Sequence, residues 1–260
     1  MAPEASAERS TGDATPDPIA LGEVARKSGD LDGAIVHFTR AIEQLPQNAK
    51  AYRSRGDAYR AQRRWTEAIA DLDQAIRLAP DDLAAYEMRG HAYGVAGRPL
   101  AAIKDFTHVI DHSPKPIIAL NNRGFAYESL NDFDAAMADY HRVLELDPRD
   151  LAALNHRAAL NIKLHRFDEA LADLDLAIEQ QPRYAKAHFN RGLILENRGQ
   201  TDGAIRAYDR AIEIQPDFAA SYYQRGRLYH QRGETSRAEA DLAKVKQLVK
   251  NRRKPEGNSR

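Results

Sequence analysis

The chain is 260 residues long, with 43% hydrophobic and 29% charged residues, which is enough apolar content for a folded core. Its 38 Lys and Arg residues balance its 38 Asp and Glu residues, and this disfavours a dedicated nucleic-acid-binding protein because such proteins normally carry a basic surface. The absence of Cys excludes disulfides, thiolate metal ligands and cysteine nucleophiles.

The first segment, residues 1–14, is predicted to be a disordered acidic tail. It has neither the basic region nor the apolar region of a signal peptide. No apolar stretch of the chain approaches the ~18 residues needed to span a bilayer. We therefore expect a cytoplasmic protein that makes no membrane contact.

A repeat of 34 residues fills the rest of the chain. Six prolines mark it, at Pro46, Pro80, Pro114, Pro148, Pro182 and Pro216. With each proline at position 32, the chain divides without insertion into repeats 15–48, 49–82, 83–116, 117–150, 151–184, 185–218 and 219–250. Position 20 is Ala in every repeat, position 24 is large, and position 8 is Gly except at Ala158. This spacing predicts two helices per repeat, since positions 4, 8 and 11 share one helical face and positions 20, 24 and 27 share another.

The ends of these helices also have sequence signals. The proline at position 32 cannot continue the second helix, and Gly or polar residues near positions 15 and 16 favour a turn between the two helices. Ser28-Gly29-Asp30 and Asn131-Asp132 are examples. In repeat 1, Asp17 and Pro18 are typical of a helix N-cap followed by proline at the first helical position.

Position 11 completes the pattern, because it is Tyr in four repeats: Tyr59, Tyr93, Tyr127 and Tyr229. Together with Ala or Val at position 27, the pattern resembles the tetratricopeptide repeat (TPR) over residues 15–250. The resemblance implies an all-α fold, a right-handed superhelical TPR solenoid of antiparallel helix pairs whose first helices line a concave groove. Departures are local: Ala158 and Asn161 in repeat 5, and no terminal proline in repeat 7.

An arginine at position 7 accompanies an aspartate at position 23. Repeats 2 to 5 and 7 have both residues, repeat 1 has neither, and repeat 6 has Arg191 but Ala207. This correlation predicts an Arg–Asp pair between the two helices of a repeat, with Arg191 using a neighbour such as Asp173. The alternative is an arginine ladder for phosphate or carboxylate, which requires these side chains to face the groove. Position 7 points to the second helix, so we favour the structural role.

The array is predicted to end at repeat 7. Positions 21 and 28 are apolar in repeats 1 to 6 but become Glu239 and Lys246, on the face that an eighth repeat would cover. The last helix should run to about Asn251. Residues 251–260 form a basic tail, which suits either a nucleic-acid contact or a helix C-terminus stabilised by the helix dipole.

The family geometry places positions 2, 5, 6, 9, 12 and 13 of each first helix in the groove. Repeats 4 to 6 offer apolar and Asn side chains there: Ile118, Asn121, Asn122, Phe125, Asn155, His156, Ile162, Phe189, Asn190 and Leu193. An Asn amide both donates and accepts, so Asn122 and Asn190 could hold an extended backbone, similar to the asparagine ladders of some TPR superhelices. Alternatively, these Asn residues cap contacts between neighbouring helices.

The sequence therefore predicts a non-catalytic protein–protein interaction scaffold that binds an extended peptide or partner segment in the groove, mainly at repeats 4 to 6. An RNA-associated protein acting through the basic tail and a self-associating assembly factor are the alternatives. The carboxylate clamp that binds Hsp90 and Hsp70 C-terminal tails is missing, since Asp57 stands where the clamp has Asn.

No enzyme chemistry is expected, and neither a cofactor nor a metal is predicted. His108 and His112 are one helical turn apart, a spacing that can ligate a metal, but no third ligand can be named. We found no glycine-rich phosphate loop and no nucleophile motif.

Overall fold

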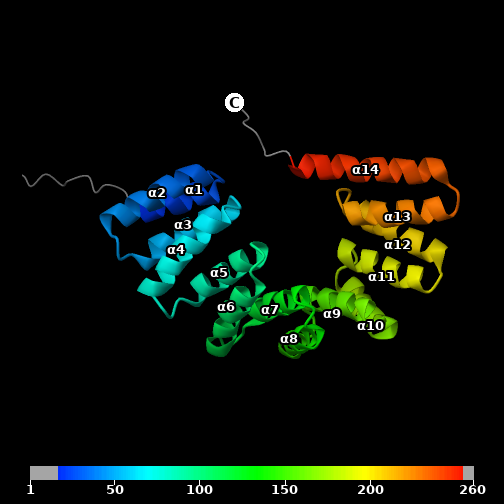
Figure 1. The fold of residues 1–260 in the computed structure, drawn as a ribbon, viewed down its shortest axis with the longest axis horizontal. Coiled ribbons are helices and arrows are strands. Elements are labelled where there is room, and N and C mark those ends of the chain that lie inside the picture. Colours follow the sequence, from blue (N-terminus) through cyan, green and yellow to red (C-terminus); the bar gives the residue numbers. More distant parts are fainter. Residues whose placement is uncertain (1–16, 254–260) are drawn as a thin grey trace, which may run out of the picture. The chain divides into compact units, whose positions relative to one another are not determined.

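The computed structural model describes residues 17–253, which form fourteen α-helices and no β-strand (Figure 1). The chain divides into two compact units between Pro114 and Lys115. The helices of the first unit are α1 (Pro18–Lys27), α2 (Leu31–Gln44), α3 (Ala49–Ala61), α4 (Trp65–Leu78), α5 (Leu83–Val95) and α6 (Pro99–His112). Predicted segment 1–14 and most of predicted segment 251–260 lie outside the described residues.

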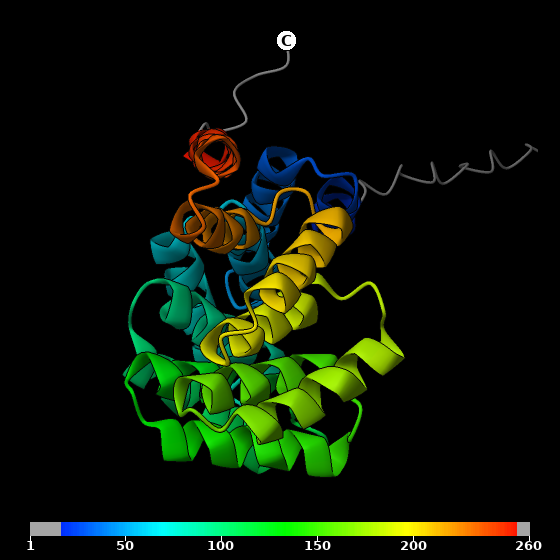
Figure 2. The ribbon, with the colours of Figure 1, turned by 90° about the vertical axis from the view of Figure 1, so that its right-hand side faces the viewer.

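The second unit continues the same alternation with eight helices (Figure 2). They are α7 (Ile117–Ser129), α8 (Phe133–Leu146), α9 (Leu151–Lys163), α10 (Phe167–Gln180), α11 (Ala185–Asn197), α12 (Thr201–Ile214), α13 (Ala219–Gln231) and α14 (Thr235–Arg253). The last helix ends two residues beyond the predicted Asn251. Glu239 and Lys246 are both exposed on it, as expected for the polar end of an array.

The turns between paired helices follow the sequence signals. The residue at position 15 has a positive φ in every repeat: Gly29, Arg63, Gly97, Asn131, His165, Gly199 and Gly233. Asp17 caps α1 by accepting a hydrogen bond from the Ile19 amide, with Pro18 at the start of the helix. Both predicted turns and the predicted cap are therefore confirmed.

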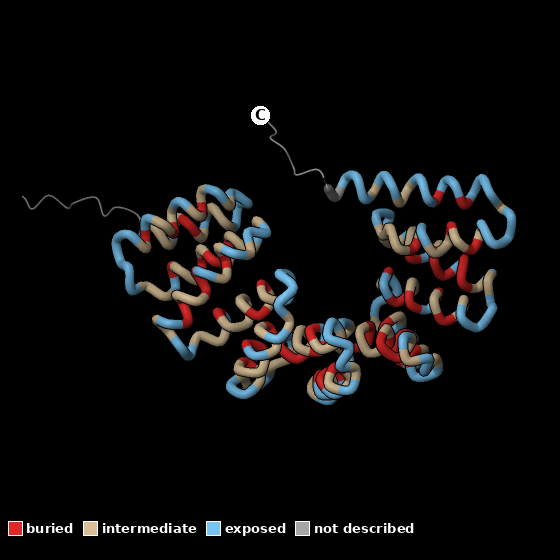
Figure 3. The backbone as a smooth tube through the Cα atoms, in the orientation of Figure 1, coloured by how far each residue is buried: buried red, intermediate tan, exposed pale blue. Residues whose placement is uncertain are grey.

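Small residues at positions 8 and 20 allow the paired helices to approach closely. The alanines at position 20 are all buried, and so is the large side chain at position 24 in repeats 1 to 6. Figure 3 shows buried stretches recurring along the helices of both units. A Cβ atom at Gly124 would lie 2.7 Å from Cε1 of Tyr140, and one at Gly90 would lie 2.8 Å from Cε1 of Phe106. Only a residue without a side chain fits opposite these rings. In repeat 5 the partner is Leu174, and there Ala158 takes the place of glycine.

Within each unit the first helices of successive repeats also contact one another. These contacts join α1 to α3 and α3 to α5 in the first unit, and α7 to α9 and α9 to α11 in the second. The first helices therefore line the inner, concave face of each unit, and the second helices line the outer face. No helix among the fourteen described has both the length and the apolar character of a membrane span.

The predicted Arg–Asp pairs form in all five repeats that contain both residues. Each guanidinium donates through Nε and Nη2 to both oxygens of its aspartate, in the pairs Arg55–Asp71, Arg89–Asp105, Arg123–Asp139, Arg157–Asp173 and Arg225–Asp241. All five aspartates are buried. The suggested partner of Arg191 is wrong: Arg191 lies 3.8 Å from Asp175, because Asp173 is already engaged by Arg157.

Gly90→Ala should lower the free energy of unfolding by about 1–3 kcal/mol, because the new methyl group overlaps the Phe106 ring. In a Phe106→Leu background the same change should cost much less, since the pair then matches Ala158 and Leu174 and Ala favours the helix by about 1 kcal/mol. Urea denaturation of the four proteins in this double-mutant cycle measures the coupling. Strictly additive losses would show that residue 90 and the ring are not in steric conflict.

Arg55→Met should lower the free energy of unfolding by about 3 kcal/mol, because it leaves the buried Asp71 carboxylate without its charged partner. Arg191→Met is the matched control, since this side chain is 45% exposed and its ion pair is long. Exposed pairs contribute little to stability. The two variants are compared by urea denaturation, and equal losses would contradict a special role for the bidentate pair.

Candidate peptide-binding surface

Three of the predicted groove residues lie on one face of α7. Ile118, Asn122 and Phe125 are separated by four and then three residues, which places them along the same side of the helix. Ile118 is 62% exposed and Phe125 is 61% exposed, unusually high values for large apolar side chains in repeats 4 to 6. The Asn122 amide between them makes no hydrogen bond to any described residue and is half-buried.

His156 on α9 extends this surface toward repeat 5. Its ring lies 6.0 Å from the ring of Phe125 and is stacked on Tyr140 at 5.4 Å with an interplanar angle of 12°. Burial lowers the pKa of His156, and the positive charge of Lys186 lowers it further, while Asp150 opposes both effects. The imidazole is therefore held toward its neutral form. We call Ile118, Asn122, Phe125 and His156 the α7 patch.

Two of the predicted Asn residues are instead used between repeats. Asn190 on α11 donates through Nδ2 to Oδ1 of Asn155 on α9 at 2.8 Å, and both residues are 7% exposed. This bond links neighbouring first helices, as the alternative interpretation of these residues expected. Asn190 is therefore buried and engaged, and Asn122 is the member of the expected pair whose half-buried amide has no hydrogen-bond partner among the described residues.

Asn121 also makes a hydrogen bond between neighbouring repeats. Its Nδ2 donates to Oδ1 of Asp150 at 3.2 Å, and Asp150 caps α9 by accepting from the Ala153 amide at 2.7 Å. The sequence analysis missed Asp150, although an aspartate directly before the helix at Leu151 is a recognisable N-cap signal. Asp150 thus joins the start of one repeat to the first helix of the repeat before it.

The remaining predicted residues are partly buried in the core. Phe189 packs between Tyr208 and Phe218, with ring centroids 5.7 and 5.1 Å away. Leu193 joins Phe189 against the cluster of Ala204, Ile205, Tyr208 and Leu228, and Ile162 packs against the cluster around Leu174. The structure therefore brings four predicted residues together on an accessible surface and places the other six in contacts between helices.

The two histidines with metal-ligand spacing pack against aromatic rings, with His108 stacked on Tyr86 and His112 tilted against His108. The ring of His108 lies 4.0 Å from that of Tyr86 and 4.3 Å from that of His112. Within residues 17–253, no group of three or more His, Asp, Glu or Cys side chains could hold a metal ion.

Comparison with known proteins identifies the repeats. Family models of the tetratricopeptide repeat match residues 19–82, 117–150, 174–206, 197–233 and 219–248, which together cover more than half of the chain. The chain belongs to the tetratricopeptide-repeat (TPR) family. The resemblance inferred from the sequence is thereby confirmed, and with it the all-α TPR solenoid fold of antiparallel helix pairs. TPR solenoids are protein-interaction scaffolds.

Solved TPR structures share this fold. A TPR protein from Parabacteroides merdae ATCC 43184 aligns with 89% of this chain and 91% of its own, with a TM-score of 0.79 and 22% identity. YrrB, a TPR protein with an unusual peptide-binding site, aligns with 71% of this chain and 95% of its own, with a TM-score of 0.55 and 25% identity. Tetratricopeptide repeat protein 36 of Caenorhabditis elegans is 44% identical over 54 residues, which are 21% of this chain and 28% of that protein.

The TPR fold should lose stability in mild acid partly through His156. The unfolded chain takes up a proton near pH ~6.5, whereas the folded chain does so only at lower pH, so the free energy of unfolding falls as pH drops below about 6.5. His156→Phe keeps a ring against Tyr140 and should lose less stability on acidification. Urea denaturation at about pH 7.5 and about pH 5.5 compares the two proteins. Equal losses would mean that His156 takes up its proton equally well in both states.

Proposed function

We propose that this TPR chain is a non-catalytic scaffold that binds an extended segment of a partner protein on the concave face of its second unit. The α7 patch is the centre of the proposed site. It contains the most exposed apolar side chains of the surface expected for repeats 4 to 6.

The observation that carries this proposal is the exposure of Ile118 and Phe125 on either side of an unpaired amide. Exposed apolar side chains that cluster on one face usually mark a contact surface. The Asn122 amide can donate to a peptide carbonyl and accept from a peptide N–H at the same time. Together these groups can hold a backbone at one point and an apolar side chain on each side of it.

The rigid support of the patch favours a preformed site. Tyr140 stacks beneath His156 and donates from its hydroxyl to Oε1 of Glu128 at 2.6 Å, so the ring is fixed at both of its ends. Because its pKa is lowered, His156 presents a neutral ring rather than a cation. This arrangement suits an apolar or aromatic partner side chain better than a charged one.

Other features of the chain are consistent with a peptide-binding TPR protein that differs from the chaperone-tail type. YrrB, at 25% identity, is a TPR protein with an unusual peptide-binding site. In the first unit, Asp57 stands where the chaperone-tail type has Asn, and its carboxylate is already engaged, because it accepts from Arg60 at 2.6 Å and lies 3.5 Å from Arg26. Cytoplasmic location, self-association and an RNA contact through the basic tail stay predictions from the sequence.

The proposal is tested by capturing partners from native lysate with the wild-type chain and with Ile118→Glu and Phe125→Glu. Both changes place a charge on the α7 patch, and partners of the patch should be depleted about tenfold or more, the effect expected of a central contact. The captured partner is then divided into overlapping peptides, and fluorescence polarisation measures which peptide binds the wild-type chain. A short segment should retain the affinity.

Leu100→Glu is the matched control, because Leu100 is an isomer of Ile118, is 72% exposed and lies on α6 in the first unit. Circular dichroism confirms that all three variants are folded. If Leu100→Glu loses the same partners as Ile118→Glu, or if neither patch variant loses any, the α7 patch is not the binding surface.

A further inference from the structure

The arginine at position 7 makes a third contact besides its two bonds to aspartate. Its remaining Nη1 group points to the residue at position 25 of the preceding repeat. Arg55 donates from Nη1 to Thr39 at 3.0 Å, Arg89 to Asp73 at 2.7 Å and Arg225 to Asp209 at 2.5 Å. Arg191 lies beside Asp175, the same position in its neighbour. In these repeats, the residue at position 25 therefore provides a side-chain oxygen next to the arginine Nη1 group of the following repeat.

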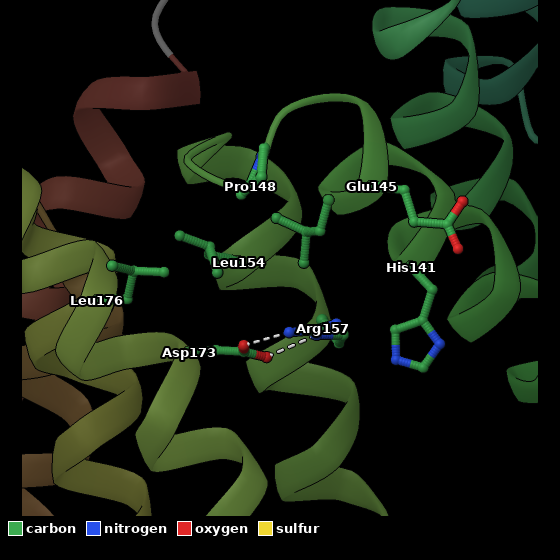
Figure 4. A pocket seen from close by; sticks show the side chains of 8 residues that line it. His141, Glu145, Pro148, Leu154, Arg157, Asp173 and Leu176 are labelled. Carbon is green, nitrogen blue, oxygen red and sulfur yellow. Dashed lines mark hydrogen bonds and ion pairs between the residues drawn. The ribbon is translucent and has the colours of Figure 1, made fainter.

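Arg157 lacks that oxygen. Position 25 of the preceding repeat is His141, and Figure 4 shows it on the opposite side of Arg157 from Asp173. Within residues 17–253, no group accepts a hydrogen bond from Arg157 Nη1, and His141 is exposed without a hydrogen-bond partner. The Arg157 side chain is 24% exposed, compared with 16% and 18% for Arg89 and Arg225, which have the third contact.

A hollow opens at this place on the outer face, where α8 and α10 both pack on α9. Its volume is about 430 Å³, and an adjoining hollow of about 370 Å³ shares His141, Arg157 and Asp173 with it. The partly exposed Leu144 and Leu176, with the buried Leu154 behind them, form an apolar wall beside the guanidinium. The space thus combines one unused cationic donor with a surface for an apolar side chain.

The charge balance at this arginine leaves room for an anion. Arg89 is surrounded by two carboxylates, Asp73 and Asp105, and Arg225 by Asp209 and Asp241. Arg157 has Asp173 alone. Glu145 lines the same hollow, but Arg142 engages its carboxylate at 2.7 Å. A carboxylate bound beside His141 would therefore give Arg157 the second carboxylate neighbour that Arg89 and Arg225 already have.

We propose that the hollow at His141 and Arg157 is a second binding site, on the face opposite the α7 patch, for an Asp or Glu side chain of a partner protein followed by an apolar side chain. The carboxylate accepts from Arg157 Nη1, and the apolar side chain packs on the leucine wall. The site is independent of the proposed groove function, because its residues lie on the other face of the repeats.

The test titrates the full chain with two capped dipeptide amides, acetyl-Asp-Leu and acetyl-Asn-Leu, and with acetate at equal ionic strength. NMR follows the Arg157 Nε–H and His141 ring signals. The Asp dipeptide should bind at least about tenfold more tightly than the Asn dipeptide or acetate, since only it offers both the charge and the apolar group. The signals of Arg89 and Arg225 should stay in place, because their third contacts are occupied.

His141→Asp supplies from within the chain the carboxylate found at Asp73 and Asp209, and it should weaken the Asp dipeptide at least about tenfold while the protein stays folded. His165→Asp is the control, because it adds the same charge to an exposed histidine of the same unit. Undiminished binding to His141→Asp, equal weakening by His165→Asp, or no saturable binding would overturn the proposal. Acetate binding as tightly as the Asp dipeptide would also overturn it, since the site would then hold an adventitious ion only.

Discussion

The close approach of the two helices in each repeat is the constraint on which the rest of the structure depends. In the repeats with an aromatic residue at position 24, its ring occupies the space where a side chain at position 8 would stand, as Tyr140 does at Gly124 and Phe106 at Gly90. The backbones can then lie near enough for the buried alanines at position 20 to fill the remaining gap. Because this packing is repeated at the same spacing, each helix pair presents equivalent faces to its neighbours.

The same spacing fixes where the polar side chains can go. Position 7 directly precedes the glycine at position 8, so its arginine lies beside the second helix. There it contacts the aspartate at position 23, which directly precedes the large side chain at position 24. The aspartate is almost fully buried, and the arginine is only slightly more exposed, as in the Arg89–Asp105 and Arg157–Asp173 pairs. Loss of the arginine would leave the buried aspartate carboxylate without a charged partner or full hydration, which explains why the two residues occur together in the sequence. The third contact, at position 25, is more exposed and varies between Thr, Asp and His.

The fold could be predicted from the sequence because its signals are periodic. Proline, alanine, glycine and the Arg–Asp pair recur at fixed positions, and each has one structural cause that does not depend on the neighbouring repeat. The groove could be predicted only in outline. Asn122 and Asn190 occupy the same position in their repeats, but Asn190 meets Asn155 of the repeat before it, whereas Asn122 meets no described acceptor or donor. Which Asn is accessible depends on the hydrogen bonds between side chains of neighbouring repeats. The 34-residue pattern does not predict these bonds, because they involve residues that differ from repeat to repeat.

This division between periodic and aperiodic positions explains how one TPR unit can offer two different surfaces. The inner patch at α7 depends on Ile118 and Phe125, which stand at neither the Gly–aromatic nor the Arg–Asp positions of their repeat. The outer hollow arises because one position-25 residue is His rather than Asp or Thr, while Arg157 and Asp173 keep the geometry found elsewhere. Each surface therefore differs from its neighbours by side chains that the fold does not require, so either can change its partner without disturbing the other.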